Sequence, residues 1–358
     1  MIDRRMFLQG GVMTAAAWAL AGRLPLAEAQ SLRTVRFGVG LKSVMPIVIN
    51  LLIGEALGYN KAEGFQMDVK SLGTNGNVQI ALDKGDIDFG VGVLSFQLPM
   101  YAKGELPPVV NFYEYTYPYK WDIAVKPGSP LKRYEDLKGK KVGVSDMGAT
   151  DYPVTRSVFR NLGMDPDKDV TWIAVGQGTP AGVALERGAI DALAYYDAGF
   201  GQIEAAGIAL MYLPRPTNIP QIGGQFIMAK KDYLNANRAL AVGVGRSVAK
   251  ASEFILANPE AGAMVFLRMF PESAPKGKSE AEASKAVLTT IARRITLFRP
   301  YDKSKKMGFI LESEILADAK FAGLDSIKDV KPLYTNELID EINSFDVEKV
   351  RAGARSYK

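Results

Sequence analysis

The 358-residue sequence contains no cysteine and no histidine. Without cysteine the chain cannot form a disulfide framework, so packing has to stabilise its folded state. The two absences together exclude Ser-His-Asp and Cys-His nucleophilic sites, the common zinc sites, and haem or iron–sulfur sites held by His or Cys. Metal or glycosidase chemistry that needs only carboxylates stays possible, although Asp and Glu are scattered along the chain without a clustered D-x-D pattern.

The sequence also lacks a strong charge of one sign and a long hydrophobic run. Its 44 basic and 39 acidic residues give a formal charge of +5 that is spread along the chain, so we expect no nucleic-acid partner. The apolar run GGVMTAAAWALAG at 10–22 is too short and too rich in Gly and Ala for a membrane span. The length and the hydrophobic content of 47% allow two buried cores, which predicts two domains.

Residues 1–29 have the features of a cleaved export signal. A basic pair, Arg4-Arg5, precedes the apolar run, and Ala27-Glu28-Ala29 forms an A-x-A cleavage site. The motif DRRMFLQ resembles the twin-arginine signal, with matches at Arg4, Arg5, Phe7 and Leu8. This resemblance implies export of the folded protein to the periplasm, and an ordinary secretory signal or a retained anchor are the alternatives.

One motif occurs twice, because ALDKGDIDFG at 81–90 returns as ALERGAIDAL at 184–193. The order Ala-Leu-acid-base-Gly is typical of a helix end closed by glycine, and Ile-Asp followed by apolar residues then opens a buried strand. FGVG at 37–40 and VGVS at 142–145 extend the match. Each copy predicts a βαβαβ unit of an open α/β sheet, which indicates two lobes of similar build. Two unrelated Rossmann-like halves with similar joints are the alternative.

The segments around the two copies predict the lobe boundaries. Aromatic and proline-rich passages at 109–130 and 211–234 flank the second copy, and helical patterns follow, one of them with Asn258 as N-cap and Pro259 in its first turn. We expect lobe 1 at 30–117 and 216–358, lobe 2 at 118–215, and two hinge crossings between them.

Three further stretches carry a family resemblance. LKRYEDLKGKKVGVSDMGATDYPVTRSVFRNLG at 131–163, the paired Ile-Asp motifs, and ILANPEAG at 255–262 resemble segments of the periplasmic substrate-binding proteins of ABC importers. The match is to their nitrate, sulfonate and taurine-type branch, which includes SsuA-like and THI5/NMT1-like proteins. The resemblance implies a two-lobed type II periplasmic binding protein, each lobe an open α/β sheet flanked by helices. Such a protein delivers its ligand to an ABC permease and its ATPase at the inner membrane. We therefore expect a monomer without catalytic residues, metal or cofactor.

Ligands of open α/β sheets bind beyond the carboxyl ends of the strands, which predicts four loops as the walls of an interlobe cleft. These loops are LKSVMP (41–46), GTNGN (73–77), VLSFQ (93–97) and DMGATDYP (146–153). In the second and fourth loops, small residues before a helix would let backbone N–H groups approach an anion. An Asn-Gly turn without a ligand role is the alternative for the second loop. The ligand contacts predicted from the four loops are Ser43, Met45, Thr74, Asn75, Ser95, Phe96, Thr150 and Tyr152.

Aromatic residues supply the remaining candidates. Tyr195, Tyr196 and Asp197 follow the second copy and could stack on and hydrogen-bond a ring, with burial against a helix as the alternative. Aromatic side chains also occupy every second position from 113 to 121, although Pro118 argues against one continuous strand. We expect this row mainly to pack the hinge, with Tyr113 as a candidate for the cleft wall. So many aromatic residues favour a planar or aromatic organic ligand over nitrate.

Two other functions stay open beside solute binding. The resemblance includes THI5-like pyrimidine-forming enzymes, but these depend on histidine and a cysteine-rich motif that this chain lacks. An exported sensor that docks on a receptor instead of a permease would have the same ligand site. The sequence favours a solute-binding protein that captures a small organic ligand, anionic or aromatic, between its lobes.

Overall fold

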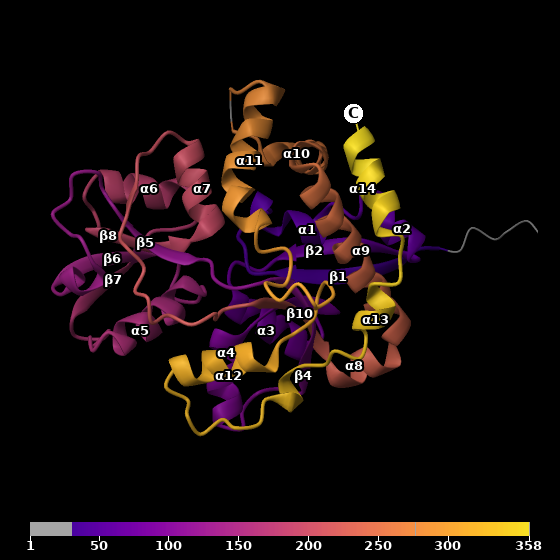
Figure 1. Ribbon diagram of the computed structural model, residues 1–358, viewed down its shortest axis with the longest axis horizontal. Coiled ribbons are helices and arrows are strands. Elements are labelled where there is room, and N and C mark those ends of the chain that lie inside the picture. Colours follow the sequence, from indigo (N-terminus) through magenta and orange to yellow (C-terminus); the bar gives the residue numbers. More distant parts are fainter. Residues whose placement is uncertain (1–30, 276, 358) are drawn as a thin grey trace, which may run out of the picture. The chain divides into compact units, whose positions relative to one another are not determined.

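The computed structural model describes residues 31–275 and 277–357, and its strands form two five-stranded sheets (Figure 1). Sheet A has the order β2 (Phe65–Ser71), β1 (Arg33–Val39), β3 (Phe89–Val93), β10 (Gln225–Lys230) and β4 (Val109–Thr116). Sheet B has the order β7 (Val170–Ala174), β6 (Lys140–Val144), β8 (Ala192–Tyr196), β5 (Trp121–Val125) and β9 (Met211–Tyr212). The expected export signal at 1–29 lies outside the described residues.

The two sheets are built alike. In each, three parallel strands are followed by a fourth strand that runs antiparallel to the third, and by a fifth that runs antiparallel to the fourth. The fourth strand, β10 or β5, begins just after the chain has left the other sheet. The doubled α/β architecture predicted from the repeat is therefore confirmed, whereas the residue boundaries of the two lobes stay a prediction.

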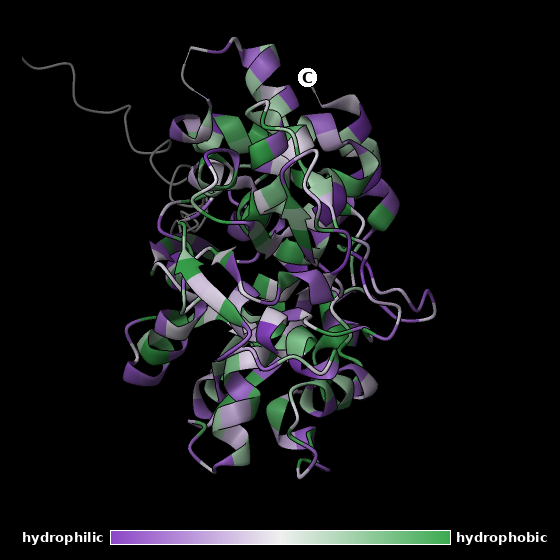
Figure 2. Cartoon of the chain, turned by 90° about the vertical axis from the view of Figure 1, so that its left-hand side faces the viewer, coloured by the Kyte–Doolittle hydropathy of each residue, from purple (hydrophilic) through white to green (hydrophobic). Residues whose placement is uncertain are grey.

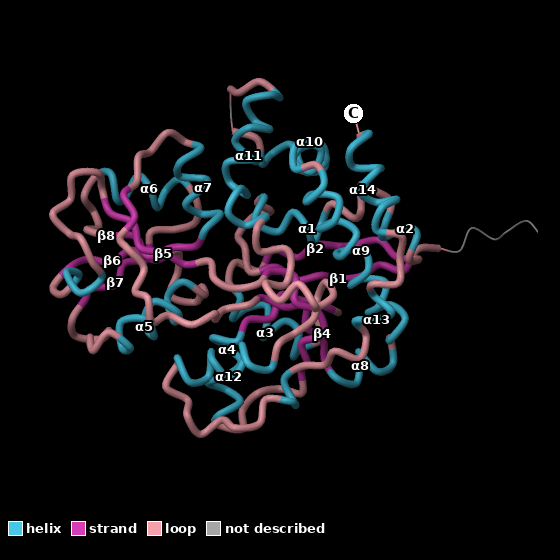
Figure 3. Tube along the Cα trace, viewed as in Figure 1, coloured by secondary structure: helices cyan, strands magenta, loops and turns pink. Residues whose placement is uncertain are grey.

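Helices surround the strands of both sheets (Figure 3). The longer ones are α3 (Asn75–Lys84), α4 (Leu94–Ala102), α5 (Asp151–Asn161), α6 (Thr179–Glu186), α7 (Asp197–Ala205), α9 (Arg238–Ala257), α10 (Pro259–Met269), α11 (Glu280–Ile295), α12 (Glu312–Phe321) and α14 (Val347–Ser356). The shorter ones are α1 (Ile49–Leu52), α2 (Tyr59–Ala62), α8 (Lys231–Ala236) and α13 (Ile339–Ile342).

Two local predictions about helices have different outcomes. Asn258 caps α10 as predicted, since its side chain accepts a 3.0 Å hydrogen bond from the N–H of Ala261 and Pro259 is the first helical residue. The apolar sequence PIVINLLIGEALG at 46–58 predicts one helix that begins at Pro46, but the segment forms only a 3₁₀ turn and the short α1. Its two glycines explain the difference, because glycine weakens a helix and Gly58 adopts a positive φ of 73°.

The repeated motif forms the same joint in both sheets. Gly85 follows α3 with a φ of 79°, and Gly188 follows α6 with a φ of 72°, a left-handed conformation that other residues disfavour. The carboxylates of Asp88 and Asp191 each accept a 2.8 Å hydrogen bond from a backbone N–H of the neighbouring strand, β1 or β6. The residues that repeat therefore connect helix, loop and strand.

Hydrophobic side chains fill the space between each sheet and its helices. Figure 2 shows these residues in green, with hydrophilic residues in purple on the outer helices and loops. Among the described residues, no helix combines the length and the hydrophobicity needed to cross a bilayer.

The chain passes between the sheets at 117–120 and at 213–224. In the second crossing, Gly223 has a φ of 82°, and the ring of Trp121 occupies the space where a side chain would stand. The N–H of Gly223 donates a 2.8 Å hydrogen bond to the carboxylate of Asp318. The backbone at this crossing is thus held against β5 on one side and α12 on the other.

We expect Gly223→Ala to destabilise the protein more than Gly207→Ala, its matched control. Both positions have a positive φ, which costs a residue other than glycine about 1–2 kcal/mol. Only at Gly223 would the new methyl group also displace the Trp121 ring, an overpacking that adds about 1–3 kcal/mol. Urea unfolding measures both variants, and equal losses of unfolding free energy would contradict the close packing at this crossing.

Candidate functional site

A cavity of about 60 Å³ lies between the strand ends of the two sheets. Because one water needs roughly 10–15 Å³ of such space, the cavity has room for a ligand of only a few non-hydrogen atoms. Its lining comes from the two sheets with their adjoining loops and helices, from the first crossing and from α11: Gly40, Leu41, Ile47, Val48, Asn75, Val91, Tyr115, Lys120, Trp121, Ser145, Ala149, Thr150, Asp151, Gln177, Tyr196, Gln225 and Arg294.

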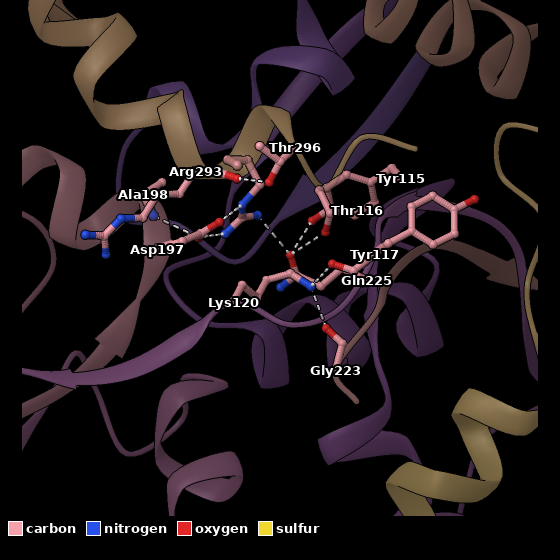
Figure 4. Close-up of polar contacts among 11 residues, drawn as sticks. Tyr115, Thr116, Tyr117, Lys120, Asp197, Ala198, Gly223, Gln225, Arg293 and Thr296 are labelled. Atoms are coloured by element: carbon pink, nitrogen blue, oxygen red, sulfur yellow. Dashed lines mark hydrogen bonds and ion pairs between the residues drawn. The ribbon is translucent and has the colours of Figure 1, made fainter. Parts of the chain in front are cut away.

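Arg294, on α11, is the first of two buried cations in the lining and is only 1% exposed. Its guanidinium forms two hydrogen bonds with the carboxylate of Asp197, and the one from Nε is 2.8 Å long (Figure 4). A third, longer bond of 3.4 Å reaches the side chain of Gln225. Burial acts to lower the pKa of Arg294, but the carboxylate of Asp197 more than reverses this effect, so the guanidinium stays charged.

The position of Arg294 follows from close packing of α11 on α7, which lie side by side in Figure 1. Gly201 on α7 has no room for a side chain because the backbone of Thr290 on α11 lies against it. Asp197 is the first residue of α7, where the helix dipole also favours a negative charge. The ion pair thus joins the C-terminal helices to the helices of sheet B.

Lys120, in the first crossing, is the second buried cation and is also 1% exposed. Its Nζ donates to the carbonyl oxygens of Gly223 at 2.5 Å and Tyr117 at 3.3 Å (Figure 4), and lies 5.1 Å from the ring centroid of Trp121. Burial, together with the nearby guanidinium of Arg294, lowers the pKa of Lys120 to about 7. Lys120 therefore has polar neighbours but no ion pair of its own among the described residues.

Sheet B and the start of α5 supply further hydrogen-bonding groups to the lining of the cavity. Asp151, the first residue of α5, accepts hydrogen bonds from the backbone N–H and the hydroxyl of Ser145 at 2.7 and 2.9 Å, and burial raises its pKa to about 7. The hydroxyl of Tyr196 is buried and has no hydrogen-bond partner among the described residues. A buried hydroxyl without a partner is costly, so Tyr196 marks a place where a ligand atom would be stabilising.

Contacts between the loops of the two sheets close the cavity. The side-chain amide of Asn75 donates a 2.6 Å hydrogen bond to the hydroxyl of Thr150. Gln177 donates to the carbonyl oxygen of Gly73 and accepts from the N–H of Lys42, both at 3.3 Å. These contacts hold the loops of the two sheets together beside the cavity.

Three of the predicted ligand contacts, Asn75, Thr150 and Tyr196, line this cavity. The other residues of the predicted loops point elsewhere. Ser43 is exposed, Met45 and Phe96 pack against the core of sheet A, and Thr74 caps α3 by accepting from the N–H of Asn77. Ser95 lines a separate cavity beside α5 and α12.

The remaining candidates contact other parts of the fold instead of the cavity. Tyr113 is part of the core of sheet A, and Tyr152 packs edge-on against a tryptophan of β7. The hydroxyl of Tyr195 binds backbone groups of the loop before α6, and Asp197 binds Arg294. None of these four lines the cavity, and their role as ligand contacts stays a prediction.

Sequence reasoning missed the two buried cations and Asp151. A signal for Arg294 was present, because Ala283, Val287, Ile291 and Arg294 recur at helical spacing and all four are buried. A charged residue on the apolar face of a helix needs a partner and is therefore a candidate for a site. Lys120 gave no such signal, since it lies in a short crossing without a regular pattern.

The described residues contain no cluster of three or more Asp, Glu, His or Cys side chains that could hold a metal ion.

We expect Asp197→Ala to lower the free energy of unfolding by about 3–5 kcal/mol, because it leaves the buried guanidinium of Arg294 without its partner. The matched control is Asp122→Ala, which breaks a more exposed 2.8 Å pair with Arg215 and should cost about 0–1 kcal/mol. Urea unfolding at neutral pH compares them. The double variant Asp197→Leu with Arg294→Met should recover much of the loss, and a double variant as unstable as Asp197→Ala would contradict this explanation.

The chain is similar to known proteins in sequence and in fold. Residues 45–262 match the family model described as NMT1/THI5 like. A curated relative, YtlA of Bacillus subtilis (strain 168), is 22% identical over 205 residues, which are 57% of this chain and 61% of YtlA. The match therefore spans less than two thirds of that relative.

Solved structures share the fold. A protein of Bordetella bronchiseptica RB50 superposes with a TM-score of 0.68 at 22% identity, covering 87% of this chain and 98% of that one. The periplasmic aliphatic sulphonate binding protein SsuA of Escherichia coli gives a TM-score of 0.57 at 20% identity, with 74% and 84% covered. The desulfurization enzyme DSZB gives 0.52 at 14% identity, with 87% and 98% covered.

At these identities the likeness establishes the fold and leaves the ligand open. The two-lobed periplasmic binding protein fold predicted from the sequence is confirmed. Since the family model matches more than half of the 358 residues, the chain belongs to the NMT1/THI5-like family.

Proposed function

We propose that this protein is an exported solute-binding protein that captures a small anionic organic ligand between its lobes and delivers it to an ABC permease and its ATPase. The observation that carries the proposal is the pair of buried cations, Arg294 and Lys120, in a cavity lined by both sheets. SsuA, named as a sulphonate-binding protein, has the same fold and supports an anionic ligand class.

The charge balance of the cavity favours an anion. Asp197 neutralises Arg294, and burial raises the pKa of Asp151, which favours its neutral form. Lys120, by contrast, hydrogen-bonds only carbonyl oxygens and lies beside an aromatic ring. A carboxylate or sulfonate beside Lys120 would favour its charged form and add a charge-assisted hydrogen bond. A neutral acceptor would favour the charged form of Lys120 less, because it lacks the attraction between opposite charges.

The volume of the cavity restricts the size of the ligand. About 60 Å³ suits a short alkyl sulfonate or carboxylate better than the planar aromatic ligand that the sequence suggested. Tyr115 and Trp121 do line the cavity, but mainly as apolar wall.

Capture would proceed by closure of the two lobes. A ligand that contacts both lobes shifts the balance between open and closed forms toward the closed one. In the closed form, the hydrogen bond from Asn75 to Thr150 and the contacts of Gln177 shield the ligand from water. Either a permease or a receptor could recognise the closed form that carries the ligand. Neighbouring genes for a permease and an ATPase would favour the permease.

A catalytic function has less support. The chain has no histidine or cysteine, and no metal-binding cluster occurs among the described residues. DSZB shows that the fold also occurs in an enzyme, so a turnover assay with each bound anion is the control for the binding proposal.

We expect small anions to raise the unfolding temperature of the mature chain, residues 30–358. A panel of methanesulfonate, ethanesulfonate, taurine, acetate, lactate and nitrate, with acetamide and ethanol as neutral controls, can be tested by differential scanning fluorimetry. A ligand present at 100 times its Kd adds about 2.7 kcal/mol to the unfolding free energy. If no anion acts after dialysis from denaturant and refolding, or if the neutral controls act equally, the proposal is wrong.

Two neighbouring tyrosines provide a matched test of the site. Tyr196→Phe removes a hydroxyl without a partner, so stability should stay unchanged while the affinity for the best anion of the panel falls roughly twofold to tenfold. Tyr195→Phe removes a hydroxyl that binds the backbone of Gly176 and Gly178, so it should lose about 1 kcal/mol of stability with little change in affinity. The reverse pattern would place the ligand elsewhere.

A further inference from the structure

Two buried glutamates lie near Lys120, one of the two cations that line the cavity. Glu114 on β4 is 1% exposed and Glu314 on α12 is 3% exposed. None of their four carboxylate oxygens has a hydrogen-bond partner among the described residues. Ionised carboxylates can only accept hydrogen bonds, so two of them side by side cannot hydrogen-bond each other. A proton on one carboxyl group would supply the missing donor.

The fold fixes both glutamates close to the second crossing. The backbone N–H of Glu114 donates a 2.9 Å hydrogen bond to the carbonyl oxygen of Gly308. Its carboxylate lies against Gly224, where a side chain would have no room. Asp318 lies one turn after Glu314 on α12, and its carboxylate accepts from the N–H of Gly223 at 2.8 Å.

Few positive charges face the pair. The titratable groups that act on Glu114 or Glu314 are Asp318 from α12, Lys120 and Tyr117 from the first crossing, and Tyr301 from the loop before α12. Arg294 and Asp197 follow beyond Lys120, already bound to each other. Lys120 is a cation that acts on both glutamates, and it also lines the ligand cavity.

This arrangement disfavours two negative charges. Burial, with the carboxylate of Glu314 as the next cause, raises the pKa of Glu114 well above its usual value. Burial raises the pKa of Glu314 and that of Asp318 to about 7. Two adjacent buried carboxyl groups titrate as one unit and share a proton over a wide pH range.

One residue, Gly223, lies between Lys120 of the ligand cavity and Asp318 beside the pair. The carbonyl oxygen of Gly223 accepts from Lys120, and the N–H of Gly223 donates to Asp318. An anion that enters the cavity beside Lys120 therefore acts on the acidic cluster through a few buried groups, where solvent screening is weak. Its negative charge makes every nearby group bind protons more tightly.

We propose that Glu114 and Glu314 form a proton-binding site that holds one shared proton in the empty protein and takes a second when an anion occupies the cavity. The incoming proton comes from the buffer and forms an O–H bond on the remaining carboxylate. The protein thus captures its anion together with a proton. This inference rests on the proposed function, because it requires an anion in the cavity.

Calorimetry tests the proton uptake directly. Methanesulfonate, or the anion with the largest effect in the unfolding panel, is titrated at pH 7.5 in phosphate and in Tris, whose different ionisation enthalpies reveal the protons taken up. We expect net uptake in the unaltered protein, reduced by at least half in Glu314→Gln. The matched control Glu312→Gln, on the same helix, should keep the full uptake. The residual uptake in Glu314→Gln reports Lys120 and Asp318.

A measurement without ligand covers the case in which the variants bind poorly. The folded protein retains a proton on the pair at a pH where the unfolded chain, with glutamate at its ordinary pKa near 4.5, has lost it. The free energy of unfolding therefore falls as pH rises from about 5 to about 7.5, the window between the two pKa values. Glu314→Gln should flatten this fall, and Glu312→Gln should not.

The outcomes separate the two proposals. If no anion binds, the proposed function fails, and a steep pH dependence that Glu314→Gln flattens would still support the shared proton. If an anion binds with no proton uptake, or with equal uptake in the unaltered protein and Glu314→Gln, the coupling between Glu314 and the ligand is wrong. An unaltered pH profile in Glu314→Gln would overturn the shared proton itself.

Discussion

The buried ion pair between Arg294 and Asp197 is the interaction on which the rest of the site depends. It joins α11, from the C-terminal region, to the first residue of α7, which follows the last parallel strand of sheet B. Taking both charges out of water is costly, and only the paired hydrogen bonds offset that cost. The pair therefore fixes the guanidinium at the cavity in one orientation and holds α11 against the start of α7.

Around this pair, the two sheets contribute different chemistry to the cavity. The first crossing and α11 supply the cations, whereas the strand ends of sheet B and the start of α5 supply Ser145, Tyr196 and Asp151. A ligand with an anionic end and a hydrogen-bonding end would contact both lobes at once. Contact with both lobes is what converts binding into closure, so the polarity of the cavity and the proposed mechanism have the same origin.

The sequence predicted the scaffold better than the site, for a physical reason. The repeated Gly and Asp act within one joint: Gly85 and Gly188 provide a positive φ, and Asp88 and Asp191 bind an adjacent strand, so the pattern is readable in a few residues. The strand-end rule likewise selected two loops that line the cavity, those that contain Asn75 and Thr150.

The same rule could not say which way each side chain points. Met45 and Phe96 lie in predicted loops yet turn to the core, and Ser95 faces another cavity. The cations come from segments that meet only in the folded chain, since Lys120 and Arg294 are far apart in sequence. Their partners, Gly223 and Asp197, are set by the crossings and by the packing of α11 on α7, which no local pattern encodes.

The buried charges also bear on what the site selects. A lysine without an ion pair and two carboxyl groups without donors lower the stability of the empty protein, and a fold under selection for stability alone would replace them with apolar residues. Their presence beside one cavity fits a site whose occupant completes the charge balance. Selectivity would then depend on the sign of the ligand's charge and on its protonation more than on its shape, since the apolar wall of Tyr115, Trp121 and Val91 accepts any small hydrocarbon part.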